Sequence, residues 1–301
     1  MNLSEIQIRD PFVLRVAAER HYYLFGTTDK NAWNGPGTGF DCYRSRDLAE
    51  WEGPIAAFRP PSDFWATTQF WAPEVHEFRG HFYMLATFKA PGVHRGTQVL
   101  KADRAEGPFA PWSDGPVTPR HWECLDGTLH VDETGAPWMV FCHEWLQVGD
   151  GEIVAIRLSD DLRRAADEPE LLFRASSAPW ARPHQNDCEG HWSPAFPKPP
   201  GDFFVTDGPF LHRAEDSSLF MLWSSNGAQG YAMGLARSAS GAVHGPWLQE
   251  PEPLWAHDGG HGMIFRSFDE KLFVTLHQPN QTPRERAIFR ELRFESGTFR
   301  I

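Results

Sequence analysis

The hydrophobic and polar positions along the chain follow one pattern that recurs five times. Each copy opens with a short polar or turn-forming segment, enters an apolar strand, turns, and continues into a second strand rich in aromatic residues. The openings are Asp10-Pro11-Phe12-Val13, Ala72-Pro73-Glu74-Val75, Asp126-Gly127-Thr128-Leu129, Asp207-Gly208-Pro209-Phe210 and His261-Gly262-Met263-Ile264. Such a recurrence indicates a repeat architecture.

The length of the repeat predicts the fold. The copies start at residues 10, 72, 126, 207 and 261, and most units are long enough for four strands with their turns. We therefore predict an all-β chain that forms a five-bladed β-propeller with four-stranded antiparallel blades, as a single domain over residues 1–301. A β-sandwich is the alternative, but its turns recur without this longer period.

The unit between residues 126 and 207 is longer than the others because it contains an insertion at about 176–203. Loops that enter inner strands lie on the same face as the strand starts, so this segment is expected to overhang the central cavity. It is rich in Pro, Trp and His. Long irregular loops are often lids, although a surface loop is an equally good interpretation.

Composition and charge narrow the function classes. The formal net charge is -12 with scattered Lys and Arg, which argues against a nucleic-acid partner. No run of 18 apolar residues exists, so no membrane span is expected. The first residues lack the basic and apolar regions of a signal peptide, and the four cysteines lack CxxC spacing. A cytoplasmic protein is expected.

The starts of the five inner strands carry the candidate chemistry. In a propeller these starts meet at one rim near the central axis, and here they supply Asp10, Ala72, Asp126, Asp207 and His261. A single Asp before Pro or Gly is often only a turn residue. Three carboxylates in register around one axis are costly unless they share protons, a metal or a substrate, so their convergence points to a functional site.

At these residues the chain resembles glycoside hydrolase family 43. The resemblance rests on Arg9-Asp10-Pro11, Trp71-Ala72-Pro73-Glu74, Asp126-Gly127-Thr128, Thr206-Asp207-Gly208-Pro209 and Gly259-Gly260-His261-Gly262, which follow the family's order and approximate spacing. It covers nearly the whole chain. No single motif is strong, whereas the ordered set is fairly specific.

The resemblance implies an inverting glycosidase. Asp10 would match the general base that activates water, and Asp126 the carboxylate that orients the acid and raises its pKa. Inversion requires a base and an acid on opposite faces of the sugar, with room for a water between them. His261 would match a ligand, through water, of a central cation such as Ca²⁺ or Na⁺, since His is a poor direct ligand for calcium. No organic cofactor is implied.

The general acid departs from the family's pattern. The family has Glu in its Thr-Glu-Gly-Pro segment, whereas this chain has Asp207, which is shorter by one methylene. Asp207 can still be the acid if backbone or substrate lies closer. The alternatives are Glu189 of the insertion or another group such as Glu144.

The expected substrate is an oligosaccharide. Loops on the same face supply candidate sugar-binding residues, because aromatic faces and hydrogen-bonding groups bind sugars; these are Trp33, Trp71, Glu144, Trp145 and Arg286. An exo-acting enzyme is expected because the insertion crowds the cavity. By resemblance the released sugar would be α-L-arabinofuranose or β-D-xylose, and β-D-galactofuranose is a third candidate because furanosides are similar in shape. The sequence leaves the oligomeric state open.

Two other functions compete with this one. A retaining fructosidase-like hydrolase is suggested faintly by Arg9-Asp10-Pro11 and Trp122-Glu123-Cys124, but that family's Asn-Asp-Pro-Asn-Gly segment is missing. A non-catalytic carbohydrate-binding propeller is suggested by Asp207 in place of Glu. A metalloprotease-type motif and a G-x-S-x-G elbow are both absent from the sequence.

Overall fold

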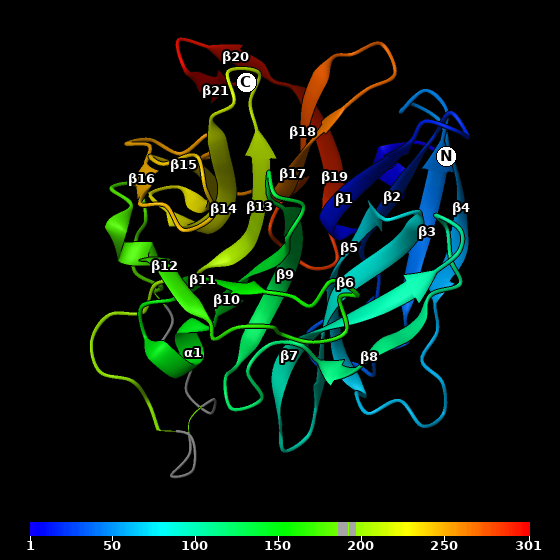
Figure 1. Cartoon of the computed structure of the whole chain (residues 1–301), viewed down its shortest axis with the longest axis horizontal. Coiled ribbons are helices and arrows are strands. Elements are labelled where there is room, and N and C mark those ends of the chain that lie inside the picture. The colour runs from blue at the N-terminus through cyan, green and yellow to red at the C-terminus, as the bar shows by residue number, and fades with distance from the viewer. Residues whose placement is uncertain (186–191, 193–196) are drawn as a thin grey trace.

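The computed structural model shows a five-bladed β-propeller, as predicted, with almost no helix. It describes residues 1–185, 192 and 197–301. The blades follow one another around a central axis, so that the blue first blade lies beside the orange fifth blade in Figure 1. Met1 is bonded to Trp51 of the first blade, and the C-terminal hairpin packs against Phe220 of the fourth.

Antiparallel sheets of four strands form the first four blades, each with its strands in chain order. The first two contain β1 (Arg9–Val16), β2 (His21–Thr27), β3 (Phe40–Ser45), β4 (Trp51–Phe58), β5 (Thr68–Phe78), β6 (His81–Ala90), β7 (Val93–Ala102) and β8 (Ala110–Pro116). The next two contain β9 (Cys124–Val131), β10 (Pro137–His143), β11 (Glu152–Arg157), β12 (Glu170–Arg174), β13 (Asp207–Arg213), β14 (Leu219–Gly227), β15 (Gly230–Ser238) and β16 (Trp247–Gln249).

The fifth sheet is shorter. It contains β17 (Gly260–Arg266), β18 (Leu272–Gln278) and β19 (Arg286–Glu291), and a separate hairpin of β20 (Arg293–Glu295) and β21 (Thr298–Arg300) follows. The short helices are η1 (Leu3–Glu5), α1 (Trp145–Val148) and η2 (Ala175–Ser177). The N-terminal segment lies against the fifth blade, where the Ile8 N–H donates to the Glu285 carbonyl at 3.3 Å.

Aromatic side chains fill the spaces between blades. The second strands contribute Tyr23, Phe25, Phe88, Phe141 and Phe220, all buried. Phe40, Phe58, Phe64, Phe70 and Phe88 form one contiguous group of tilted and edge-on contacts between the first two blades. The high aromatic content therefore builds the core, because large rings bury much area and pack edge to face.

Each inner strand begins with the same irregularity. A register shift interrupts the pairing at the start of β1, β5, β13 and β17, and the corresponding break in β9 lies opposite Val140 and Cys142. The residues with φ near +50° at these places are Asp10, Ala72, Asp126, Gly208 and His261. A bulge of this kind re-aims a side chain. Four non-glycine residues in the left-handed region are strained, which is typical of functional sites.

The backbone N–H of each bulge residue is held by a side chain. The Ala72 N–H donates to Thr27 Oγ1 at 2.8 Å, and the Asp126 N–H donates to Thr87 Oγ1 at 2.9 Å. In the fifth and first blades the His261 N–H donates to Ser224 Oγ and the Asp10 N–H to His277 Nδ1. These acceptors come from the second strand of the preceding blade, so neighbouring blades fix one another's bulges.

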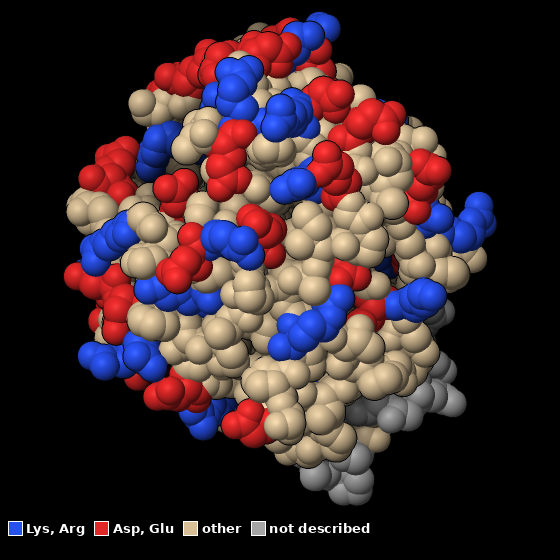
Figure 2. Space-filling view, turned by 90° about the vertical axis from the view of Figure 1, so that its right-hand side faces the viewer, with Lys and Arg blue, Asp and Glu red and all other residues tan. Residues whose placement is uncertain are grey.

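The surface agrees with the charge distribution expected from the sequence. On the face shown in Figure 2, acidic and basic side chains are interspersed among uncharged residues, and no broad basic area is visible. No helix in the described part of the chain is long and apolar enough to cross a membrane.

Candidate active site

A cavity of about 1110 Å³ opens at the rim where the inner strands begin. All three predicted carboxylates, Asp10, Asp126 and Asp207, line it together with His261. The expectation that the repeat brings these residues to one place on the propeller axis therefore agrees with the structure.

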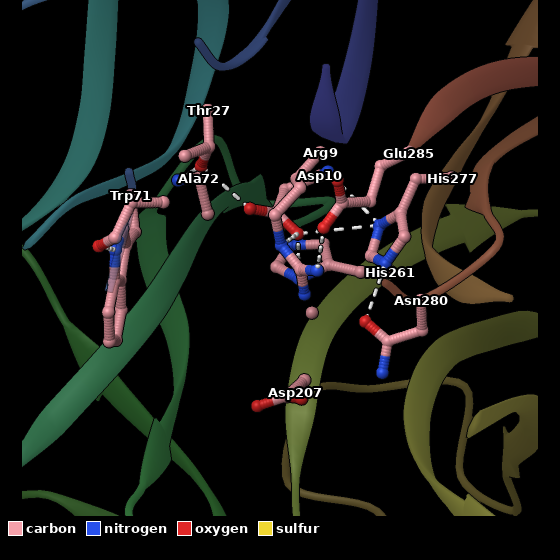
Figure 3. A network of polar contacts seen from close by, with 12 residues as sticks. Arg9, Asp10, Thr27, Trp71, Ala72, Asp207, His261, His277, Asn280 and Glu285 are labelled. Atoms are coloured by element: carbon pink, nitrogen blue, oxygen red, sulfur yellow. Dashed lines mark hydrogen bonds and ion pairs between the residues drawn. The ribbon is translucent and has the colours of Figure 1, made fainter. Parts of the chain in front are cut away.

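Asp10 is held in place by contacts with Thr27, Arg9 and His277. Thr27 Oγ1 donates to Asp10 Oδ2 at 2.7 Å, and Arg9 Nε lies 3.9 Å from Oδ1 (Figure 3). His277 accepts the Asp10 N–H at Nδ1, while its Nε2 faces Asn280 Oδ1 at 3.2 Å. His277 is therefore neutral with its proton on Nε2, and burial together with the charge of Arg9 lowers its pKa to about 3.

His261 connects two of the carboxylates. Its Nδ1 lies 3.2 Å from Asp10 Oδ1 and 3.6 Å from Asp126 Oδ2. Burial works against the charged ring, but the negative charges of Asp10 and Asp126 outweigh it and raise the pKa of His261. Asp126 also accepts the Gly208 N–H at 3.0 Å, so its orientation is fixed from the next blade.

Asp207 is not in the same register as the other two carboxylates. The bulge position of the fourth blade is Gly208, and Asp207 is the residue before it, equivalent to Arg9 in the first blade. A Cβ at Gly208 would lie 2.6 Å from the His261 ring, and φ there is +51°. Only glycine fits, so the carboxylate of this blade comes from one residue earlier, a correction to the predicted alignment.

Tyr231 holds Asp207. The Tyr231 hydroxyl, from β15, donates to Asp207 Oδ2 at 2.9 Å. Its ring stacks on His277 with centroids 5.7 Å apart. Asp207 is more exposed to the cavity than Asp10 or Asp126. Because Oδ2 is engaged by Tyr231, Oδ1 is the oxygen that can carry a proton toward a substrate.

The surroundings lower the pKa of Asp10 and raise the pKa values of Asp126 and Asp207. Burial alone would raise the pKa of Asp10, but His261 and Arg9 hold it below its usual value, so Asp10 is ionised. Burial and the charges of Asp207 and Asp10 raise the pKa of Asp126 to about 7. Burial also raises the pKa of Asp207. Protonation is therefore easier at Asp126 and Asp207 than at Asp10, which stays ionised beside them.

An aromatic wall borders the cavity on the first blade. Trp33, which is 44% exposed, packs edge-on against Trp71 with centroids 5.3 Å apart. The Trp33 N–H donates to Thr282 Oγ1 at 2.9 Å, which connects the loops of the first and fifth blades. Arg9 lies over the Trp33 ring and donates to the buried Glu285 at 2.7 Å. Both tryptophans line the cavity, as expected for sugar-binding residues.

A buried charged network adjoins this aromatic wall. Arg95 pairs with Glu144, stacks over Trp71 at 4.6 Å, and donates to Gln69 Oε1. Burial raises the pKa of Glu144. The Arg95 contact engages Glu144 as an acceptor, which suits a binding wall better than the alternative acid.

Of the remaining residues predicted from the sequence, one lines the cavity, one lies away from it, and one is outside the described residues. Trp145 lines the cavity and contacts His184 of the insertion, with ring centroids 5.0 Å apart. Arg286 is not among the cavity-lining residues; its Nε donates to the Ser4 carbonyl at 2.8 Å and its Nη1 to the Glu285 carbonyl. Glu189 lies outside the described residues.

Several site residues were not predicted individually. His277 occupies a repeated position, four residues after the aromatic of each second strand, together with Thr27, Thr87, Cys142 and Ser224. That spacing could have identified it. Tyr231 and Arg95 lie on third strands, and no local pattern shows that they reach the axis.

A directly ligated calcium at His261 does not fit these contacts. Ca²⁺ takes six to eight oxygen ligands, whereas His261 offers nitrogens, and its Nδ1 is already paired with Asp10 and Asp126. In the described part of the chain, no group of three or more His, Cys, Asp or Glu side chains is arranged to hold a metal ion.

A propeller whose axial cavity combines a carboxylate of lowered pKa with two carboxylates of raised pKa is arranged as a glycoside hydrolase. The family model for glycosyl hydrolases family 43 matches residues 3–300, and the chain belongs to that family. It is thus an inverting glycoside hydrolase, as the sequence resemblance predicted.

Solved structures agree with the family. An endo-arabinase from Bacteroides thetaiotaomicron is 40% identical, with a TM-score of 0.88 and 99% of each chain covered. A thermostable family-43 glycoside hydrolase is 24% identical, with a TM-score of 0.79, 98% of this chain and 92% of that chain covered. An endo-1,4-beta-xylanase from Bacteroides thetaiotaomicron is 22% identical, with a TM-score of 0.76, 98% of this chain and 94% of that chain covered. A search of curated proteins found no match.

Proposed function

We propose that the enzyme hydrolyses α-L-arabinofuranosidic bonds in oligosaccharides and releases terminal arabinofuranose. The observation that carries the chemistry is that Asp10, Asp126 and Asp207 line one cavity at the axis, where the surroundings lower the pKa of Asp10 and raise those of Asp126 and Asp207. The similarity to a protein described as an endo-arabinase supports the sugar. β-D-Xylosides and β-D-galactofuranosides are the competing substrates.

The residues have separate roles in the proposed mechanism. Asp10 takes a proton from a water that attacks the anomeric carbon, while Asp207 gives its proton to the departing glycosidic oxygen. Burial and the charge of Asp10 raise the pKa of Asp207. Asp126 orients the backbone at Gly208, and the repulsion between the Asp126 and Asp207 charges opposes ionisation of both. Arg9 and His261 keep Asp10 ionised, which is the state that a general base requires.

The shape of the cavity supports release of terminal units. One side is closed where Trp33 bonds to Thr282. The side near the insertion is closed where His184 contacts Trp145 and bonds to Asn226 at 3.0 Å. Walls on two sides favour a chain that enters by its end. The similar endo-arabinase is described as acting internally, so the lengths of the products decide between the two modes.

A cation at His261 bound through water remains a proposal that rests on the family resemblance alone. No step above uses it.

The experiment combines substrate and stereochemistry. The enzyme is tested on a panel of 4-nitrophenyl furanosides and pentosides, and the first-formed sugar is followed by ¹H NMR. Rapid release from the α-L-arabinofuranoside, with the β-anomer formed first, supports the proposal. Preference for another sugar would contradict the proposed arabinofuranoside substrate. Formation of the α-anomer first would indicate a retaining, fructosidase-like mechanism, and the absence of any hydrolysis would favour a carbohydrate-binding propeller.

The mode of action is read from a debranched arabinan digest. Steady release of arabinose alone supports terminal cleavage, whereas early formation of longer oligosaccharides contradicts it. The Asp10→Asn variant is the matched control, because it removes the base and should retain sugar binding.

A further inference from the structure

A second cavity of about 460 Å³ lies beside the first, over the second blade. Three segments on the same face form it: the loop before β5, the start of β7 and the end of β8 with the residues after it. Val93, His94 and Arg95 line both cavities. The two spaces are therefore neighbours across a short barrier at the start of β7.

This barrier is rigid on the side of the active cavity. The Arg95 N–H donates to Glu123 Oε2 at 2.9 Å, and the Arg95 guanidinium is held by Glu144 and Gln69. Lys89 pairs with Glu123 at 2.8 Å. Since Arg95 is 5% exposed and bonded in several directions, the barrier keeps its shape when a ligand passes over it. Val93, which is 47% exposed, is its outermost part.

The lining of the second cavity combines an oriented aromatic surface with polar groups. The Trp65 N–H donates to Gln98 Oε1 at 2.6 Å, and Gln98 Nε2 donates to the Ser113 carbonyl at 2.9 Å. Gln98 is itself buried, so the indole is held at a fixed angle. Further lining residues are Phe64, Asp63, Asp114, Thr118 and Arg120. Aromatic faces with hydrogen-bonding groups around them suit a sugar.

We propose that this second cavity binds the sugar units on the leaving-group side of an oligosaccharide whose bond is cut in the first cavity. The inference rests on the proposed function and names where the chain leaves the active site. The second cavity adjoins the catalytic one and shares lining residues with it, whereas hydrogen bonds join the loops on the sides near Thr282 and Asn226. A chain held at Asp10 and Asp207 therefore leaves over Val93 and rests on Trp65.

The test compares substrates of different length. Specificity constants are measured for 4-nitrophenyl α-L-arabinofuranoside and for linear arabino-oligosaccharides of two to five units. In the native enzyme we expect the constant to rise with chain length. Val93→Trp should reduce the ratio of the pentasaccharide to the aryl-glycoside constant about tenfold, which corresponds to about 1.4 kcal/mol of lost interaction. Arg120 lines the second cavity, so Arg120→Ala should lower the same ratio.

The matched control is Val131→Trp. Val131 is 41% exposed at the end of β9 and lines neither cavity, so this variant should keep the native ratio. A direct binding measurement uses Asp10→Asn, which cannot hydrolyse the ligand. By calorimetry its affinity should rise with oligosaccharide length, and the rise should disappear in Asp10→Asn with Val93→Trp.

The outcomes separate the two proposals. If both Val93→Trp and Arg120→Ala hydrolyse the aryl glycoside normally and keep the native ratio of specificity constants, the proposed role of the second cavity is wrong. The proposed function is then unaffected. If the panel identifies another sugar, the same ratio is measured with oligosaccharides of that sugar, and a loss in Val93→Trp still supports the cavity. Hydrolysis of no glycoside would overturn both.

Discussion

The carboxylates at the axis do not all occupy the same position in their blades. Asp10 and Asp126 occupy bulge positions, while the fourth blade has Gly208 there and uses Asp207 instead. The space that a side chain at 208 would need is occupied by His261. The sequence predicted that these three carboxylates share one cavity, which the structure shows. It did not predict this offset, because the obstruction comes from a residue of another blade.

Removing the charge of Asp126 should change the pH dependence. Asp207 must be protonated to act as acid, so activity falls as pH rises through the pKa of the coupled pair, where Asp126 titrates at about 7. Asp126→Asn removes the neighbouring negative charge and lowers the pKa of Asp207. The alkaline limb of the kcat/KM profile should move to lower pH and activity at neutral pH should fall. A limb that stays in place or moves upward would contradict this role.

At the scale of elements, the bulges are the feature that builds the site. Five inner strands begin with the same break in pairing, and side chains from the second strand of the preceding blade hold four of the bulges. The fourth blade is the exception: its equivalent acceptor position is Cys142, and the Gly208 N–H donates to Asp126 instead. The repeat in the sequence predicted the strands. It could not predict the bulges, because they depend on bonds between blades.

One such bond can be tested with an isosteric change. Thr87→Val keeps the shape of the side chain but leaves the buried Asp126 N–H without its acceptor, which should destabilise the fold by about 1–3 kcal/mol. Activity should fall as well, because Asp126 is then less firmly oriented. Chemical denaturation and kcat provide the two measurements.

Thr128→Val is the matched control. Its buried hydroxyl has no hydrogen-bond partner among the described residues, so removing it should be neutral or stabilising. Equal effects in the two variants would mean that the bond from Asp126 to Thr87 contributes nothing specific.

At the scale of the whole molecule, the ring of blades also partly buries two histidines. His130 and His212 stand at equivalent places on the inner strands of neighbouring blades. Burial, and then the charges of Arg213 and Arg266 respectively, lower each pKa to about 4. These rings are neutral in the folded state. The sequence repeat shows their equivalent positions, but their burial follows only from closure of the ring.

Stability should therefore fall in mild acid. Between pH 6.5 and 4 the unfolded chain binds protons at His130 and His212 that the folded chain does not, so the free energy of unfolding decreases as pH falls through this window. The melting temperature should decline across it. His212→Phe removes one of these sites and should make the decline shallower. An equal slope in that variant would show that other groups cause the loss.

The central claim is that Asp207 protonates the departing oxygen while Asp10 activates water. The most direct test measures Asp207→Asn on substrates with different leaving groups. A leaving group of low pKa needs little protonation, so hydrolysis of 2,4-dinitrophenyl α-L-arabinofuranoside should be largely retained, while cleavage of arabino-oligosaccharides should fall about 10²–10⁴-fold. Equal losses on both substrates, or this selective loss in Glu144→Gln instead, would contradict the account.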